Sequence, residues 1–261
     1  MSNYHLAKQY LNYLVKGQSR FYLHSPFVYQ LVEEVFRDKR HFYAYEDIET
    51  LRKVLLGRGE SITIQDLGAG SRVNATTTRR IDRMVKEVAI TPKYGQLLFR
   101  LINHFKPQSM LELGTSLGIS ALYQAKANPN IPFFTIEGAP QLAQLAQQNF
   151  SKLQAHNIQL IVGNFEEYLP AILEKMEDLD YAFIDGNHRK KPTLSYFKQC
   201  LAKASNEALF IFDDIHWSPE MTECWKEICE HPQVTVSIDL YRMGLVFIRK
   251  EQTKQHFMLW F

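Results

Sequence analysis

The 261-residue sequence has few cysteines, no long apolar run and almost no excess of charge of either sign. Its three cysteines form no CxxC pair and have no histidine at metal-ligand spacing, so we expect buried free thiols in a reducing cytoplasm. No apolar stretch reaches the length of a membrane span, and the first thirty residues lack the layout of a signal peptide. The formal net charge of +2 gives no electrostatic basis for a nucleic-acid partner. These absences predict a cytoplasmic globular protein with no membrane partner.

The first ninety residues differ from the rest of the chain in their pattern of apolar residues. Apolar side chains at mixed three- and four-residue spacing predict helices over residues 4–16, 25–37 and 45–56. The segment D-L-G-A-G-S at 66–71 looks like a ligand-binding loop, but no strand ending in an acid follows it before residue 90. We therefore predict a helical N-terminal cap over residues 1–90, with a short strand and turn at 61–71. A second domain, residues 91–261, follows it.

From residue 107 onward, short apolar strands alternate with amphipathic helices, which is typical of a parallel sheet with helices on both faces. The predicted strands are 110–113, 132–136, 158–162, 181–184, 209–212, 234–238 and 245–248. The predicted helices between them are 119–127, 140–156, 165–176 and 191–204. Only residues 239–244 join the last two strands, which is too short for a parallel crossover. The sequence therefore predicts a Rossmann-like, doubly wound α/β sheet of seven strands, with the last strand antiparallel.

The ends of the first two strands of this domain carry a ligand-binding pattern. The first strand runs into E-L-G-T-S-L-G-I-S at 112–120, where two glycines permit a tight turn and close approach of a ligand to a helix N-terminus. Glu137 ends the next strand, about 20 residues after the glycine loop. An acid at this sequence separation can accept hydrogen bonds from ribose hydroxyls. The E-L-G-T-S-x-G-x-S pattern resembles the first motif of class I S-adenosylmethionine (SAM)-dependent methyltransferases, in particular the catechol and caffeoyl-CoA type of O-methyltransferase.

This resemblance, which covers residues 90–250, implies SAM as the cofactor. The loop would wrap the methionine part of SAM, Glu137 would hold its ribose, and the residues after the third strand would lie by its adenine. Asp185, after the fourth strand, would orient the cofactor amine. The implied cofactor-binding residues are Glu112, Gly114, Thr115, Ser116, Gly118, Ser120, Glu137, Asn164, Phe165 and Asp185. The Gly95-Gln96 pair also resembles the segment before the first motif, which lines the cofactor and acceptor site in the family.

Three carboxylates follow the fourth and fifth strands of this domain: Asp185, Asp213 and Asp214. Adjacent parallel strands would bring them together, and clustered carboxylates repel one another unless a cation joins them. An all-oxygen ligand set suits Mg²⁺, Mn²⁺ or Ca²⁺. The arrangement resembles the metal site of catechol-type and bacterial Mg²⁺-dependent sugar O-methyltransferases. The alternative is that Asp213 caps the next helix and Asp185 only orients the cofactor.

The position of the general base departs from the family pattern. The family commonly has Lys three residues after the first metal Asp, or Asp two residues after it, and this sequence has His188 and Asn187 there. His188 is therefore the candidate catalytic base, with His216 behind it. The predicted reaction is methyl transfer from SAM to a hydroxyl of a small molecule, assisted by a divalent metal.

Three other functions stay open at this point. The chain could bind SAM without catalysis, or methylate RNA or a modified nucleoside through the basic patch at 189–191. The loop also satisfies G-x-S-x-G, which in a hydrolase would pair Ser116 with a late histidine such as His256. A homodimer is equally open, since the apolar tail 256–261 must pack either on the cap or on a second subunit.

Overall fold

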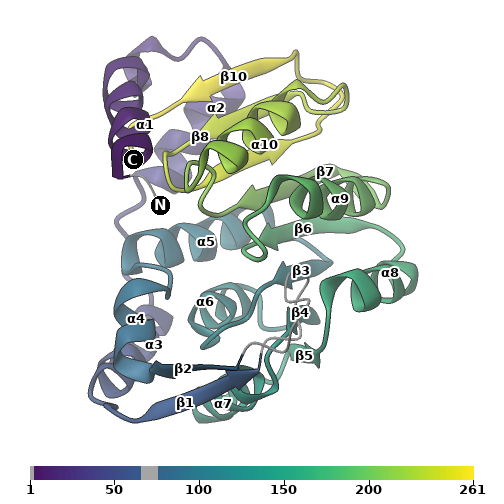
Figure 1. Cartoon of the computed structure of the whole chain (residues 1–261). Coiled ribbons are helices and arrows are strands. Elements are labelled where there is room, and N and C mark those ends of the chain that lie inside the picture. Colours follow the sequence, from purple (N-terminus) through teal and green to yellow (C-terminus); the bar gives the residue numbers. More distant parts are fainter. Residues whose placement is uncertain (1–2, 66–75) are drawn as a thin grey trace. The chain divides into compact units, whose positions relative to one another are not determined.

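The computed structural model describes residues 3–65 and 76–261, and the chain forms two compact units. The middle unit is Arg37–Ile172, and the terminal unit combines Met1–Phe36 with Leu173–Phe261. Figure 1 labels most of the elements of both. The predicted boundary between a cap and a second domain at residue 90 stays a prediction.

The middle unit contains a parallel three-stranded part of the sheet, in the order β3-β4-β5, and a separate antiparallel pair, β1-β2. Its elements are α3 (Tyr43–Leu56), β1 (Ser61–Gln65), β2 (Thr76–Arg80), α4 (Ile81–Glu87), α5 (Pro92–Phe105), β3 (Met110–Leu113), α6 (Ile119–Ala127), β4 (Phe133–Glu137), α7 (Pro140–Lys152), β5 (Ile158–Val162) and most of α8 (Phe165–Lys175). The strands predicted at 110–113, 132–136 and 158–162 are confirmed to within one residue.

Helices α3, α5 and α6 pack together beside β3. Gly95 of α5 lies so close to α6 that a side chain there would meet the Tyr123 ring at 2.5 Å. The Tyr123 hydroxyl donates to Glu49 of α3 at 2.8 Å, and Tyr45 of α3 stacks edge-on against Phe99 of α5. Tight helix packing therefore accounts for the glycine of the Gly95-Gln96 pair.

The strand that precedes the first glycine-containing segment, β1, pairs antiparallel with β2. Residues 61–65 form a strand, as predicted, while the loop at 66–71 lies outside the described residues. Strand β2 was not predicted, because its sequence T-T-T-R-R has no apolar alternation. Neither strand belongs to the parallel sheet.

The terminal unit contains the five-stranded arrangement β10-β8-β9-β7-β6. Its elements are α1 (Asn3–Lys16), η1 (Arg20–Tyr22), α2 (Pro26–Leu31), η2 (Val32–Phe36), β6 (Leu179–Ile184), α9 (Lys190–Leu201), β7 (Ala204–Phe212), α10 (Pro219–Glu230), β8 (Val236–Asp239), β9 (Gly244–Phe247) and β10 (Gln255–Met258). Strand β9 inserts between β7 and β8 and runs antiparallel to both, which confirms the reversed strand predicted from the short connection at 239–244.

Helices cover both faces of these strands. On one face, Phe197 of α9 packs edge-on against Phe212 of β7, and Trp225 of α10 lies against Gly244 of β9. Side chains alternate along a strand, so Phe247 points to the other face, where it meets Phe27 of α2 at 5.0 Å. This two-sided cover is the doubly wound arrangement that the sequence predicts.

The C-terminal tail adds a strand to the seven that were predicted. Strand β10 pairs in parallel with β8, so the reversed strand β9 is not the last in the chain. The Tyr13 hydroxyl of α1 donates to the Leu259 carbonyl at 2.7 Å and accepts from the Phe261 amide at 2.9 Å. Of the two predicted places for the tail, it therefore packs on the N-terminal helix α1, and the predicted strand count of seven was one too low.

Candidate active site

The loop after β3 has the backbone geometry that a close ligand requires. Gly114, Ser116 and Gly118 all have positive φ, at 104°, 49° and 77°. A side chain at Gly118 would meet the Phe150 ring at 2.4 Å, so only glycine fits where the loop enters α6. Asn149 of α7 donates to the Leu117 carbonyl at 2.9 Å and holds the loop from outside. The loop is thus rigid and ends at a helix N-terminus, which is a favourable place for an anionic group.

Glu137 joins this loop to the end of β4. One carboxylate oxygen accepts the Ser116 amide at 2.7 Å, and the other accepts the Ala139 amide at 2.8 Å. Although Glu137 is separated from the loop by a helix in sequence, the fold places its carboxylate beside the loop backbone, as the spacing predicts.

Glu112 lies beneath the loop with no exposed surface. It accepts from Gln124 at 2.7 Å and from the Thr135 hydroxyl at 2.6 Å, and Ser120 also bonds to it. Because Thr135 donates to Glu112, Thr115 is the donor in the 2.6 Å contact between the two threonines. Burial raises the pKa of Glu112 to about 7, and the hydrogen bonds from its neighbours oppose that rise. Glu112, Ser120 and Thr115 form a buried polar network under the loop.

The residues predicted to lie by the adenine begin α8. The Asn164 side chain accepts the Glu166 amide at 3.0 Å, so it caps this helix, and its amide nitrogen is not used in that bond. Phe165 is half-buried in the first turn. Before them, Gly163 has its amide bonded to the Glu137 carbonyl at 2.9 Å, which ties the end of β5 to the end of β4.

The second set of predicted residues follows β6 and β7 in the terminal unit. His188 Nε2 lies 3.7 Å from Asp185 Oδ1, and both side chains are partly exposed. Asp213 is almost fully buried, while Asp214 is partly exposed. Asn187, His188 and Asp214 have positive φ, a conformation that residues other than glycine adopt rarely and that concentrates at functional sites.

Arg242 joins these carboxylates and was not predicted. It lies in the turn between β8 and β9, where its backbone carbonyl accepts the Ile215 amide at 3.2 Å. Its guanidinium donates to both oxygens of Asp213, at 3.3 and 3.4 Å, and lies 3.7 Å from Asp214. We call Asp185, His188, Asp213, Asp214 and Arg242 the β6–β7 cluster.

The cluster is electrostatically strained despite this arginine. Burial raises the pKa of Asp214, and the neighbouring Asp213 raises it further, while Arg242 and His188 oppose both effects. Burial lowers the pKa of Arg242, but Asp213, Asp214 and Asp185 outweigh it, so this pKa lies above its usual value. Within the described residues, no three His, Cys, Asp or Glu side chains are gathered as a metal would require. The metal assignment of Asp185, Asp213 and Asp214 stays a prediction.

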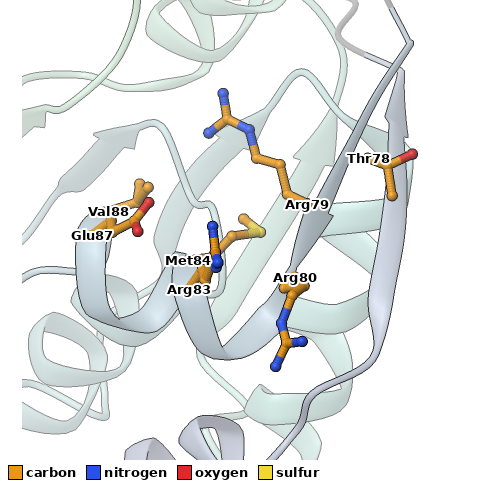
Figure 2. A pocket seen from close by; sticks show the side chains of 7 residues that line it. All are labelled: Thr78, Arg79, Arg80, Arg83, Met84, Glu87 and Val88. Atoms are coloured by element: carbon orange, nitrogen blue, oxygen red, sulfur yellow. The ribbon is translucent and has the colours of Figure 1, made fainter.

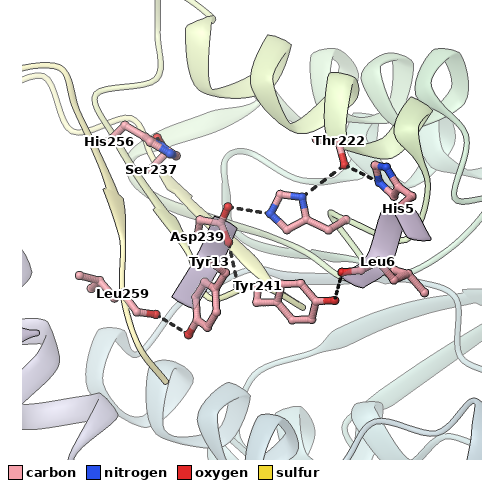
Figure 3. Close-up of polar contacts among 10 residues, drawn as sticks. His5, Leu6, Tyr13, Thr222, Ser237, Asp239, Tyr241, His256 and Leu259 are labelled. Carbon is pink, nitrogen blue, oxygen red and sulfur yellow. Dashed lines mark hydrogen bonds and ion pairs between the residues drawn. The ribbon is translucent and has the colours of Figure 1, made fainter. Parts of the chain in front are cut away.

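His216, the second base candidate, has a structural role in this unit. Its Nε2 lies 2.8 Å from Asp239 and its Nδ1 3.3 Å from Thr222, which also contacts His5 of α1 (Figure 3). Only 6% of the residue is exposed. His216 therefore links α1, α10 and β8, whereas His188 remains partly open to solvent.

The residues of two alternative functions are also engaged in internal contacts. In the basic patch, Arg189 donates to Asn187 at 2.9 Å, and Lys190 pairs with Glu227 at 3.1 Å. His256, the late histidine of the hydrolase alternative, lies on β10 and bonds to Ser237 at 2.8 Å.

A cavity of about 590 Å³ lies elsewhere in the middle unit, between β2 and α4, and contains none of the predicted site residues. Figure 2 shows its lining, with Arg79 and Arg80 leaving β2 in opposite directions. Arg80 is paired with Asp82 at 3.0 Å. The residues that line the cavity are Thr78, Arg79, Arg80, Arg83, Met84, Glu87 and Val88.

Comparisons with known proteins agree with the loop motif. Residues 111–215 match the family model described as a methyltransferase domain. A catechol O-methyltransferase from Niastella koreensis is 28% identical over 144 residues, which cover 54% of this chain and 64% of that protein. A transmembrane O-methyltransferase from Propithecus coquereli is 37% identical over 84 residues, which cover 31% of each protein. The chain thus spans less than two thirds of the length of these relatives.

The fold agrees over a longer stretch. An O-methyltransferase from Streptomyces achromogenes, involved in tomaymycin synthesis and solved in complex with SAM, has a TM-score of 0.59 at 19% identity, covering 85% of this chain and 94% of that one. No helix in the described part of this chain is long and apolar enough to cross a membrane. The chain is therefore similar, over 111–215 in sequence and over most of its length in fold, to the class I SAM-dependent O-methyltransferases, which confirms the resemblance predicted from the loop at 112–120.

Proposed function

We propose that this protein transfers a methyl group from SAM to a hydroxyl of a small molecule. The observation that carries the proposal is the pairing of the loop with Glu137, whose carboxylate accepts the Ser116 amide at 2.7 Å. A glycine loop and a ribose-binding acid are expected together in a nucleoside-containing cofactor site. The match to a methyltransferase domain and the SAM-bound structure of similar fold point to SAM as that cofactor.

In this proposal the middle unit binds the cofactor. The backbone of Gly114–Gly118 would hold the methionine part of SAM, and Glu137 would accept hydrogen bonds from the ribose. Asn164 and Phe165 would contact the adenine with an amide and a ring. Glu112 and Ser120 would act through the loop that they support, since both are buried beneath it.

The β6–β7 cluster would bind the acceptor and take its proton. Methyl transfer from a sulfonium breaks the S–CH₃ bond as the hydroxyl oxygen forms the new O–CH₃ bond, and it needs mainly alignment. The hydroxyl proton would pass to His188, which Asp185 orients from 3.7 Å. Residues 1–90 would serve as a cap that helps to select the acceptor, in a protein of the cytoplasm.

The resemblance also implies a divalent ion, which would polarise the acceptor hydroxyl. The residues of the β6–β7 cluster do not fit it well, because the positively charged Arg242 guanidinium already lies against both oxygens of Asp213. The proposed mechanism therefore contains no step through a metal.

Calorimetric titration with S-adenosylhomocysteine tests the cofactor site. Glu137→Ala removes hydrogen bonds to a charged group, each of which contributes about 1.5–3 kcal/mol, so we expect affinity to fall by roughly 10- to 100-fold. Glu87→Ala is the control, because Glu87 is an exposed acid of the same unit at the cavity of Figure 2. Loss of affinity in Glu87→Ala alone would move the cofactor to that cavity, and no binding by the wild type would refute the proposal.

Turnover on a panel of hydroxyl-containing small molecules tests the reaction. We expect His188→Gln to lower the rate by about 100-fold, the usual contribution of a general base, and to leave S-adenosylhomocysteine affinity unchanged. Binding without turnover on any acceptor would favour a SAM-binding protein that does not catalyse. Turnover only on RNA would favour the nucleic-acid alternative.

A further inference from the structure

We propose that the Arg242 guanidinium takes the place of a divalent cation in the β6–β7 cluster, so that this chain binds its acceptor without a metal ion. The inference rests on the proposed function, since it concerns the acceptor site of that reaction. Its basis is the ion pairing of one arginine with the two carboxylates, Asp213 and Asp214, that a metal would otherwise join.

The turn between β8 and β9 fixes Arg242 in this position. The Leu240 amide bonds to the Met243 carbonyl at 2.9 Å, and the Arg242 amide bonds to the Leu240 carbonyl at 2.9 Å, so the turn is tight. Tyr241 next to it has a φ of 69°. The Ile215 amide bonds to the Arg242 carbonyl and ties the turn to the segment that carries Asp213 and Asp214. The backbone of this turn fixes the position of Arg242, and the ion pairs with Asp213 and Asp214 fix its guanidinium.

The contacts of Asp213 place a positive charge beside both of its oxygens. Its carboxylate is 2% exposed and receives a two-pronged bond from Nε and Nη2 of Arg242. Such two-pronged pairs are geometrically specific, and at 3.3 and 3.4 Å these two bonds are longer than the strongest charge-assisted bonds. A divalent ion in contact with Asp213 would have to displace the guanidinium or tolerate a like charge a few ångströms away. Part of the positive charge that a metal would bring to the cluster is thus already supplied by the chain.

Arg242 also has donors to offer the acceptor. A guanidinium has five N–H donors, and within the described residues the bonds to Asp213 use one on Nε and one on Nη2. Its side chain is 26% exposed, so the remaining donors can reach a ligand. The planar guanidinium presents its N–H groups side by side, so it favours a methyl acceptor that carries a second oxygen next to the reacting hydroxyl. Such an acceptor would be held by hydrogen bonds in place of chelation.

Binding of Mn²⁺, followed by electron paramagnetic resonance, tests this inference without any turnover. We expect the wild type to bind Mn²⁺ no more tightly than about millimolar, the range of weak carboxylate sites. Arg242→Gln removes the competing cation and should bind Mn²⁺ about tenfold more tightly or better. Arg242→Lys keeps the positive charge and should stay near the wild type. We expect wild-type turnover to be the same in excess chelator and in excess Mg²⁺.

Arg249→Gln is the matched control, because Arg249 is an arginine of the same unit that pairs with Glu207 and Glu251, outside the cluster. It should leave Mn²⁺ binding unchanged. Micromolar Mn²⁺ binding by the wild type that Asp213→Asn abolishes would overturn the inference, as would an Arg242→Gln protein that gains no affinity. If Arg242→Gln does not fold, the wild type and Arg242→Lys decide the question. S-adenosylhomocysteine titration of the same samples keeps the outcomes separate, since failure there refutes the proposed function alone.

Discussion

The carboxylates beside the loop of the middle unit and those of the terminal unit are stabilised by different kinds of partner. In the middle unit, Glu112 and Glu137 accept hydrogen bonds from neutral donors, which are backbone amides, a side-chain amide and hydroxyls. In the terminal unit, Asp213 and Asp239 are paired with Arg242 and His216, side chains that carry or can carry a charge. Neutral dipoles leave the net charge around the loop unchanged, whereas a charged partner such as Arg242 makes the β6–β7 cluster less negative.

This difference has a consequence for mutation. The amides and hydroxyls that bond to Glu112 and Glu137 come from a continuous strand–loop–helix and its neighbouring strand, so we expect the loop to respond to mutation as one piece. The terminal unit also has contacts between segments far apart in the chain, such as those of α1 with α10 and with the turn before β9. We therefore expect substitutions in the loop to have large local effects, and those in the terminal unit to act through smaller, separable contacts.

The largest effect is expected for Gly118→Ala. The added Cβ would meet Phe150 at 2.4 Å in a backbone with a φ of 77°. Overpacking and left-handed strain together cost about 2–5 kcal/mol, so we expect S-adenosylhomocysteine affinity to fall by about 100-fold or more. Calorimetric titration measures the affinity. Gly57→Ala is the control, since Gly57 has a φ of −79° and its nearest contact would lie at 3.4 Å. Wild-type affinity in Gly118→Ala would show that the loop is not rigid.

The next effect concerns pH and Glu112. Its pKa in the folded protein is raised to about 7 from an ordinary value of 4.5, chiefly by burial, so the folded state favours the protonated form. A folded protein that binds the extra proton is most stable at low pH, and this contribution is lost as the pH rises from about 4.5 to about 7. At 1.36 kcal/mol per pKa unit, the loss amounts to about 3 kcal/mol.

Glu112→Gln should remove this dependence, because the amide is neutral at every pH. Urea unfolding of the wild type and the variant at pH 5 and pH 8 measures it, and we expect the wild type to lose more stability than the variant. Glu166→Gln, at an exposed position of α8, should leave the pH dependence of the wild type unchanged. Equal losses in the wild type and Glu112→Gln would mean that Glu112 is ionised in the folded protein.

Sequence reasoning succeeded where the signal is local. The loop at 112–120 and the acid at 137 belong to one β-loop-α-β unit, and a strand with apolar residues on both faces is easily recognised. The reversed strand β9 also followed from a local quantity, the length of one connection. Strand β2 was missed because its residues are polar, and β10 because a short run beside a chain end gives no alternation.

Arg242 is a functional candidate that a single sequence reveals only in part. The role of an arginine depends on which strand neighbours its turn, and that neighbour is decided by insertion of β9 between β7 and β8. A signal was nevertheless present. Once β9 is predicted to run antiparallel to β7, the turn before β9 must lie next to the carboxyl end of β7, which Asp213 follows. A cation in that turn is then a candidate partner for clustered carboxylates.

The smallest effect tests whether the terminal unit depends on separable contacts. The Tyr13 hydroxyl bridges the Leu259 carbonyl and the Phe261 amide, and so fastens α1 to the end of β10. Tyr13→Phe removes both bonds and should destabilise this tie by about 1–2 kcal/mol. We expect amide hydrogen exchange to become faster in α1 and β10, while β3, β4 and β5 keep their protection. Tyr4→Phe, at a residue 76% exposed, is the control and should change neither region. If Tyr13→Phe also accelerated exchange in β3 or β4, the loop would depend on the chain ends, and the two units could not be treated as independently stabilised.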